Sequence, residues 1–480
     1  MSSFERKHPS TRSPAKRRRR RKSGSESRTQ IVLGWVALLV VFAATLRNGG
    51  THPLAWHLLC LTTFVLFAMQ VVLDLWHGLP RQARKALWVA LPWFAVLAWL
   101  QVQSLAGLAP ALAHPFWAIA PDGASPTISA HPDAGRQVVM RLTCYAMLFW
   151  IFLRCAGSRS RDGVAFIQAI AIFSTALAIY GMVSKATGYN VLLDADETAR
   201  QLRASFWYRN AYATFAVFGV LANITAYVRS VSGNGNRDGR YALRDYLEAF
   251  FAGGWIFAFG ALVGLVAIAM TQSRAGAMAG VVGVVVLVWA LRRGSGKVHL
   301  ALLAVPVALA VFVGLFMTSG VVSRLDRIDD DARLGIFRQV VAGVIDRPLL
   351  GHGAGAFPEA FRPYVALEQA AFDWNKAHNT YLENAFEFGL PAAALFFFAL
   401  AMIGRRLVSG VLTRKRNQST PAFALACFAA AAFHSVFDFS LQIPAIAALF
   451  AAILGIGWAQ SFPTRRVTKT VQRRPRVDDL

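Results

Sequence analysis

Long apolar runs separated by short polar segments make up most of this chain of 480 residues. A helix needs about 20 apolar residues to cross a bilayer. Twelve runs approach that length, so the sequence predicts an all-α, polytopic integral membrane protein. The predicted spans are residues 30–46, 53–75, 86–108, 138–153, 164–185, 210–228, 250–271, 276–291, 298–318, 381–404, 421–437 and 441–460.

The basic residues lie in alternate loops of this pattern. Cytoplasmic loops of membrane proteins are rich in Lys and Arg. An N-terminus in the cytoplasm places the alternate basic loops on the inner side, and twelve spans return the C-terminus to that side. The inner segments are then 81–85, 154–161, 229–244, 292–297, 405–416 and 465–476.

The same pattern divides the chain into five parts. A basic cytoplasmic tail, residues 1–29, is expected to be disordered, and spans one to nine follow in residues 30–318. An outer, periplasmic loop covers residues 319–380, spans ten to twelve cover residues 381–460, and a second basic tail covers residues 461–480. A connection of this length points to a functional loop.

The composition excludes a soluble multidomain protein. Hydrophobic residues make up 56% of the chain and charged residues 16%, against about 45–50% and about 25% in soluble proteins. The net charge of +25 includes the run Lys16–Lys22. A nucleic-acid-binding arm is one interpretation of that run, but a tail held at anionic headgroups fits a membrane protein better. The four cysteines form no CxxC pair, which disfavours disulfides and structural zinc. The first span reads as a retained anchor, since no signal-peptide cleavage site follows it.

The outer loop contains a predicted helix and two notable motifs. Apolar residues from Leu334 to Ile345 have helical spacing, and Pro348 should end the helix, which would lie on the membrane or cap the bundle. The segment Gly351–Gly355 lacks the Gly-Lys-Ser/Thr of a phosphate-binding loop and is read as a turn. His378 has no second histidine at metal-ligand spacing, so a general base is a more natural role than a metal ligand.

Arginines in two short outer segments break the charge pattern. Arg200, Arg203 and Arg209 lie in one of them, and Arg274 lies in a tight outer turn. One interpretation is that these arginines bind a phosphate group. The alternative is that their side chains extend to the lipid headgroups. The acidic segments 194–196 and 329–331 resemble a metal-binding pattern but are expected to be solvated.

Four segments, in order along the chain, resemble the O-antigen ligase/polymerase superfamily of membrane glycosyltransferases. They are residues 205–213, residues 273–276, residues 346–357 together with 378–383 and 389–390, and residues 434–444.

This resemblance implies a GT-C-like glycosyltransferase in the bacterial inner membrane, with its active site on the periplasmic side. It implies inverting transfer of a glycan from an undecaprenyl-diphosphate donor to a hydroxyl acceptor, with no metal or other cofactor. Arg274, Arg203 and Arg209 would bind the diphosphate, and His378 would be the catalytic base. The residues expected to support them are Asn379, Glu383, His434 and Asp438. His434 and Asp438 are four apart and would share a helix face, where a structural link is the favoured interpretation.

The expected partners are the undecaprenyl-diphosphate-linked oligosaccharide, a glycan or lipid A–core acceptor, the bilayer and a chain-length regulator, with no nucleic acid. Polymerisation of O-antigen or exopolysaccharide repeats is favoured, and ligation to lipid A–core stays open. The alternative class is a transporter or flippase. No repeated halves are visible, and the single large outer loop argues against that class.

Overall fold

The computed structural model describes residues 14–108, 110–157, 160–193, 195–196, 201–231, 242–294, 326–370, 373–414 and 418–462. These residues form an all-α membrane protein, as predicted. The long helices are α1 (Pro14–Thr45), α2 (Pro53–His77), α3 (Arg81–Gln103), α4 (Pro132–Ala156), α5 (Ser160–Thr187), α6 (Arg209–Val231), α8 (Trp255–Met270), α9 (Arg274–Gly294), α11 (Asp326–Asp346), α14 (Leu390–Thr413), α15 (Ser419–His434) and α16 (Pro444–Ala459). The short elements are α7 (Ala242–Ala249), α12 (Phe357–Ala360), α13 (Thr380–Phe388), η1 (Asn48–Gly50), η2 (Pro110–Leu112), η3 (Pro115–Ile119), η5 (Phe250–Gly254), η6 (Arg362–Tyr364), η7 (Leu367–Gln369), η8 (Ser440–Gln442), β1 (Tyr189–Asn190) and β2 (Ala195–Asp196).

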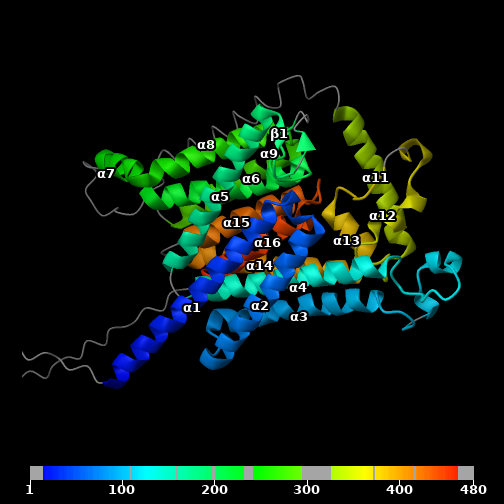
Figure 1. Cartoon of the computed structure of the whole chain (residues 1–480), viewed down its shortest axis with the longest axis horizontal. Coiled ribbons are helices and arrows are strands. Elements are labelled where there is room, and N and C mark those ends of the chain that lie inside the picture. The colour runs from blue at the N-terminus through cyan, green and yellow to red at the C-terminus, as the bar shows by residue number, and fades with distance from the viewer. Residues whose placement is uncertain are drawn as a thin grey trace, which may run out of the picture.

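Eleven of the predicted spans correspond to apolar helices among the described residues. Nine of these helices are long enough to cross a membrane, and α15 and α16 are shorter. The ninth predicted span, residues 298–318, lies outside the described residues. α16 is buried along its whole length in the centre of the bundle, mainly against α4 and α15. α1, α3, α6 and α14 also contact it, and its label lies in the middle of the bundle in Figure 1.

Two element boundaries differ from the prediction. α1 begins at Pro14, so the basic run forms the first turns of a helix instead of a disordered tail. Lys and Arg are good helix formers, which explains this extension. The tenth span begins at Leu390 rather than Tyr381, because α13 ends at Gly389 with φ of 80°. Pro391 then starts α14 in the first turn, where proline is favoured.

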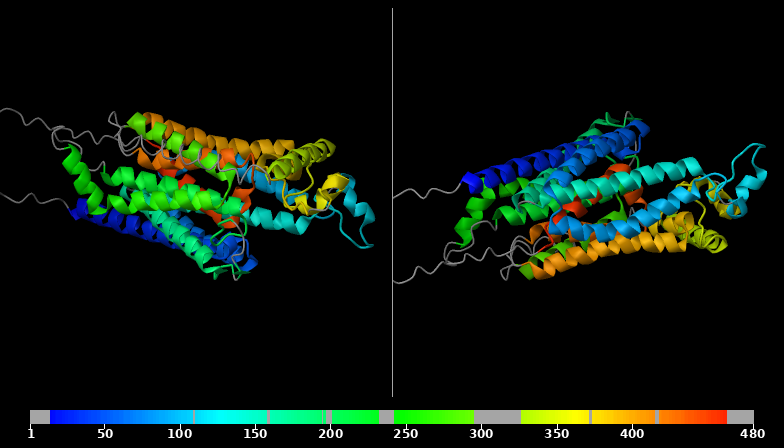
Figure 2. Two further views of the ribbon diagram at one scale, coloured as in Figure 1. Left: turned by 90° about the horizontal axis from the view of Figure 1, so that it is seen from above. Right: turned by 90° about the horizontal axis from the view of Figure 1, so that it is seen from below.

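The elements of the outer loop stand beyond one end of the bundle. α11, α12, α13 and the segment with η2 and η3 lie together there, while α7 and the start of α1 lie at the opposite end (Figures 1 and 2). We call these the site end and the opposite end. The predicted helix is confirmed as part of α11. Its buried face carries Ile336, Val340 and Val344, which pack with Phe357 and Phe386, whereas Val341 and Ile345, expected on the apolar face, are exposed.

Candidate functional site

Four described non-glycine residues have positive φ, and three of them lie in segments that carry site candidates; the fourth is Asn48 (53°). These three are Ala204 (47°), Gln272 (53°) and His378 (54°). Residues with a side chain rarely adopt this conformation, and such strain is concentrated at functional sites. Each lies next to a residue selected from the sequence, because Arg203 precedes Ala204, Arg274 follows Gln272 and His378 is itself a candidate.

The turn between α8 and α9 holds Arg274 at the first position of α9. The Ser273 hydroxyl accepts a hydrogen bond from Gly276 N at 3.1 Å and so caps this helix. The Thr271 hydroxyl accepts one from Ser273 N at 3.2 Å. Gly276 is required by packing, since a Cβ there would lie 2.6 Å from Ala213 Cβ. Arg274 therefore projects from a fixed helix end, whose partial positive charge also favours anions.

The other two arginines lie against the same turn. Leu202 N donates a hydrogen bond to Met270 O at 2.8 Å, and this bond joins the segment of Arg203 to the end of α8. Arg209 begins α6, and its Nη1 lies 3.5 Å from Gln272 O. Two segments that are distant in sequence thus form one arginine-bearing surface at the site end.

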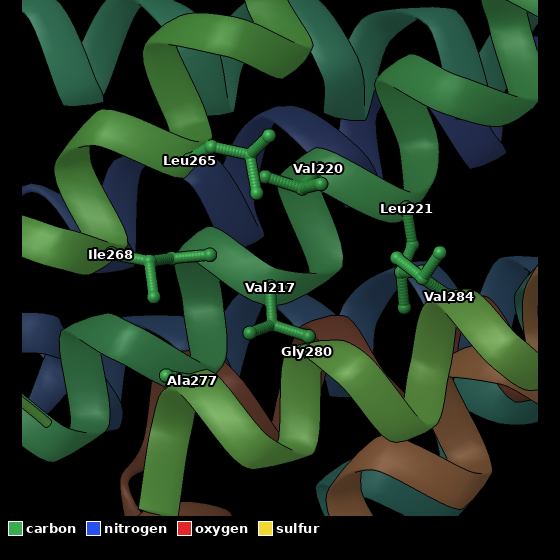
Figure 3. Close-up of a pocket in the computed structure, with 8 residues that line it drawn as sticks. All are labelled: Val217, Val220, Leu221, Leu265, Ile268, Ala277, Gly280 and Val284. Atoms are coloured by element: carbon green, nitrogen blue, oxygen red, sulfur yellow. The ribbon is translucent and has the colours of Figure 1, made fainter. Parts of the chain in front are cut away.

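The helices beneath this surface are tightly packed. A cavity of only about 10 Å³ lies between α6, α8 and α9, and its walls are entirely apolar (Figure 3). That volume is close to one water molecule. Gly280 and Val217 face each other across it, which allows α6 and α9 to approach closely. This packing fixes the helix ends that carry Arg209 and Arg274.

Asp438 connects the arginine-bearing segments to the segment of His378. Its Oδ2 accepts a hydrogen bond from Asn210 Nδ2 at 2.5 Å, and its carbonyl accepts one from the Thr380 hydroxyl at 2.8 Å. Asn210 follows Arg209, and Thr380 lies two residues after His378. Asp438 is buried, so these bonds form a rigid link.

The prediction that His434 and Asp438 share a helix face is wrong. α15 ends at His434, so Asp438 is not one turn further along a helix. His434 Nδ1 instead lies 2.6 Å from the Thr214 hydroxyl and 3.5 Å from the Ser440 hydroxyl. Ser440 also donates to Asp438 at 2.9 Å. The two residues are thus linked through Ser440, in agreement with the structural interpretation of the pair.

Phe439 lies between His378 and the arginine segment. Its ring centroid is 5.1 Å from that of His378 and also 5.1 Å from that of Tyr208. Asn379 has a structural role, because its side-chain oxygen accepts hydrogen bonds from Tyr381 N and Leu382 N, both at 3.0 Å, and caps α13.

Glu383 holds the chain next to His378. Its Oε1 lies 3.0 Å from Lys376 Nζ, and its Oε2 accepts a hydrogen bond from Ala377 N at 2.9 Å. Burial would lower the pKa of Lys376, but the negative charges of Glu383 and Glu387 outweigh it and raise this pKa. Burial, reinforced by Glu383, raises the pKa of Glu387 to about 7, although Lys376 opposes this.

The segment Gly351–Gly355 is a packing element and not a plain turn. A Cβ on Gly351 would lie 2.4 Å from Glu387 O, and one on Gly353 would lie 2.0 Å from Ser129 Oγ. Between them, the buried His352 ring stacks on Phe386 with centroids 4.1 Å apart. His352 also lies against His114, a residue that the sequence analysis missed.

A cavity of about 1080 Å³ extends from the site end into the bundle. Its walls are mainly apolar side chains of α2, α3, α4, α14 and α16. Its polar lining residues include Gln137, Arg141, Lys376, Thr380, Asn384 and Glu387. Trp207, Tyr208 and Phe439 line it too, so it adjoins the arginine segment. Arg141 lies inside a predicted span and was not among the predicted site residues.

The comparisons with known proteins identify one region of the chain. Residues 259–397 match the family model described as O-antigen ligase. No curated protein matches the chain. The matched region includes Arg274 and His378, whereas Arg203, Arg209 and Asp438 lie outside it. The match confirms the resemblance that the sequence motifs indicated.

Proposed function

We propose, since the chain belongs over residues 259–397 to the O-antigen ligase family, that it transfers a glycan from an undecaprenyl-diphosphate donor to a hydroxyl acceptor at the site end. The observation that carries this proposal is the link through Asp438 and Phe439, which joins His378 to the segments of Arg209 and Arg274. A base and several cations at one membrane boundary are the groups that this reaction needs.

The arginines would hold the donor. Departure of the diphosphate builds negative charge on its oxygens, and guanidinium groups offer paired donors that stay charged at any physiological pH. Arg274 at the start of α9, with Arg203 and Arg209 beside that turn, would stabilise this charge. We therefore propose diphosphate binding for these residues, with no metal or cofactor in the reaction.

His378 would accept the proton of the acceptor hydroxyl. The acceptor oxygen then bonds to the anomeric carbon as the bond from that carbon to the diphosphate oxygen breaks. Direct attack from the opposite face inverts the anomeric configuration. Glu383 would position His378 through its bonds to Lys376 and Ala377, while Asp438 and His434 would position it through Thr380 and Ser440.

The proposed setting is the bacterial inner membrane, with the site end in the periplasm and both termini in the cytoplasm. Polymerisation of O-antigen or exopolysaccharide repeat units is the proposed reaction, with a chain-length regulator as partner. Ligation to lipid A–core is the second reaction that the same groups would perform, because donor and bond chemistry are shared.

Glycan analysis in cells tests the proposal. His378→Ala and Arg274→Ala should abolish polymer and accumulate lipid-linked repeat units at normal protein level. His77→Ala, an exposed histidine on α2, and Arg136→Ala, an exposed arginine on α4, are matched controls. Single repeats on the final acceptor would indicate a lost polymerase, and long lipid-linked chains without acceptor decoration would indicate a lost ligase.

Normal polymer in both variants would overturn the site assignment. A transporter or flippase predicts another result, since movement of a lipid-linked glycan needs no base at His378. In that case repeat units should accumulate on the cytoplasmic side, where an impermeant lectin added to intact spheroplasts does not reach them.

A further inference from the structure

The cavity of about 1080 Å³ has a charged end that the proposed donor site does not use. Among the described residues that line it, Arg203, Arg209 and Arg274 are absent. Arg141 and Lys376 are present instead. The described residues therefore place two cations on the cavity lining and three arginines outside it, and Phe439, which lines the cavity, contacts His378.

Arg141 has no negative partner among the described residues. It lies inside α4, where its guanidinium faces the Trp56 ring with Cζ 5.5 Å from the centroid. Its Nε lies 3.4 Å from Gln137 O, and no carboxylate of the described chain forms an ion pair with it. An arginine within a span is costly and usually marks a functional cavity. Its side chain is thus available for an anion.

Lys376 contributes a second cation at the same end. One direction of its ammonium group is taken by Glu383 at 3.0 Å. An ammonium group has three donors, so further hydrogen bonds are open to it. The charge of Arg141 is near enough to act against protonation of Lys376. An anion between these two residues would relieve that repulsion.

The cavity walls suit a long apolar chain. Phe67, Trp93, Phe397 and Phe450 are among the aromatic side chains that line it. At the end remote from Lys376, the cavity reaches Asp74, which is fixed by Arg154 at 2.6 Å. The volume is at the upper limit for small-molecule sites. A polar head at one end and a hydrocarbon tail along the bundle would fill it.

We propose that the cavity binds the acceptor as a phosphorylated lipid, with its phosphate on Arg141 and Lys376 and its chain between α3, α4, α14 and α16. The acceptor role rests on the proposed function. Phe439, Lys376 and Thr380 line the cavity and flank His378, whereas none of the three donor arginines lines it. The phosphate site itself rests on the cavity, Arg141 and Lys376, and does not depend on the role of His378.

Native mass spectrometry of the full chain from detergent tests this site. The probes are undecaprenyl diphosphate and diphosphorylated lipid A, and undecaprenol is the uncharged control. Arg141→Gln should weaken binding of one phosphorylated probe by roughly tenfold to a hundredfold, the effect of one lost charged hydrogen bond. Arg141→Lys should bind more tightly than Arg141→Gln. Arg136→Gln on the same helix, exposed and paired with Asp133, should have no effect.

The probe that responds identifies the source of the phosphate. If Arg141→Gln, made in an Arg274→Ala background, loses binding of undecaprenyl diphosphate, the acceptor is that of a polymerase. If it loses binding of lipid A, the acceptor is that of a ligase. The inference would be overturned if Arg141→Gln and Arg136→Gln bound each phosphorylated probe equally well. It would also be overturned if Arg141→Gln weakened the binding of undecaprenol as much as that of the phosphorylated probes. Lipid binding measured by mass spectrometry does not depend on catalysis, so this experiment separates failure of the phosphate site from failure of His378 as base.

Discussion

His114 Nε2 lies 3.0 Å from His352 Nδ1, and this contact joins η3 to the glycine-rich segment of the outer loop. The surrounding bonds fix both tautomers. His114 Nδ1 accepts a hydrogen bond from Phe116 N at 3.2 Å, so its Nε2 carries the proton and donates to His352. His352 Nε2 then donates to Gly343 O at 2.9 Å. This chain of bonds requires two neutral rings.

Acidification should therefore loosen this contact. Burial lowers the pKa of His114 to about 3, helped by the charges of His352 and Arg347. Burial also lowers the pKa of His352 to about 4, although the bond to Gly343 opposes it. Both values lie below the ordinary 6.5, so the unfolded segment binds protons first as pH falls. The stabilisation is complete above pH 6.5 and is lost as pH falls towards 4.

Hydrogen exchange between pH 7.5 and 4.5 measures this loss. In the native chain, the protection factors of the amides of residues 114–119 and 351–355 should decrease as the pH falls. His352→Gln should show a flatter profile, because an amide does not titrate. His77→Gln, which changes an exposed histidine, should keep the native profile. An acid-independent native profile would contradict the prediction.

Gly353→Ala should destabilise the protein more than Gly123→Ala. Both glycines have positive φ, at 106° and 88°. An added Cβ at Gly353 meets Ser129 Oγ at 2.0 Å, whereas nothing lies within 4 Å at Gly123. Backbone strain of roughly 1–2 kcal/mol is common to both variants. The steric clash adds about 1–3 kcal/mol to Gly353→Ala alone.

Thermal unfolding of the two purified variants in the same detergent gives the comparison. A clearly lower Tm for Gly353→Ala, with transfer activity reduced in parallel, agrees with a packing role for residues 351–355. Equal Tm values would mean that the close approach to Ser129 contributes little, and that only the positive φ requires glycine.

Glu387 should respond to pH in the opposite direction from the histidine pair. Burial and Glu383 raise its pKa to about 7. The folded state therefore favours the protonated acid, so this stabilisation is present below the unfolded pKa near 4.5 and is lost as pH rises through 7. This contribution to the decrease of Tm falls between pH 4.5 and 7, and Glu387→Gln should remove it. A variant with the native slope over that range would assign the slope to another group.

Hydropathy and charge together predict most of the bundle. The runs of apolar residues fix the spans, since each must cover a bilayer, and the arginines that break the charge pattern mark the loops at the site end. The limits of the tenth span were missed because the apolar residues continue through Gly389. A glycine followed closely by Pro391 is the local signal of that helix boundary.

Tertiary partners explain the remaining errors. Arg141 is a single charge inside an apolar run, and one charge does not change the prediction of a span. Its importance appears only when Lys376 and Glu387 are brought to the same cavity. His114 is 238 residues from His352, so no local pattern connects them. His434 at the end of α15 likewise contacts Thr214 and Ser440, which come from other segments.

Asp438→Asn should reduce transfer while the protein stays folded. The carboxylate accepts hydrogen bonds from Asn210, Phe439 N and Ser440. An amide keeps the size but presents an NH₂ group to some of these donors, so at least one charge-assisted bond is lost. We expect roughly a tenfold to hundredfold lower kcat, since the cost of such a bond is about 1.5–3 kcal/mol.

Steady-state kinetics with a lipid-linked donor distinguish positioning from binding. Because Asp438 connects His378 to the arginine segment and is proposed to contact neither substrate, kcat should fall with KM for the donor nearly unchanged. Asn210→Asp should lower kcat similarly, because it places two carboxylates together. Thr413→Ser, which changes an exposed hydroxyl on α14, is the control. A large rise in donor KM in Asp438→Asn would instead place Asp438 in the donor site.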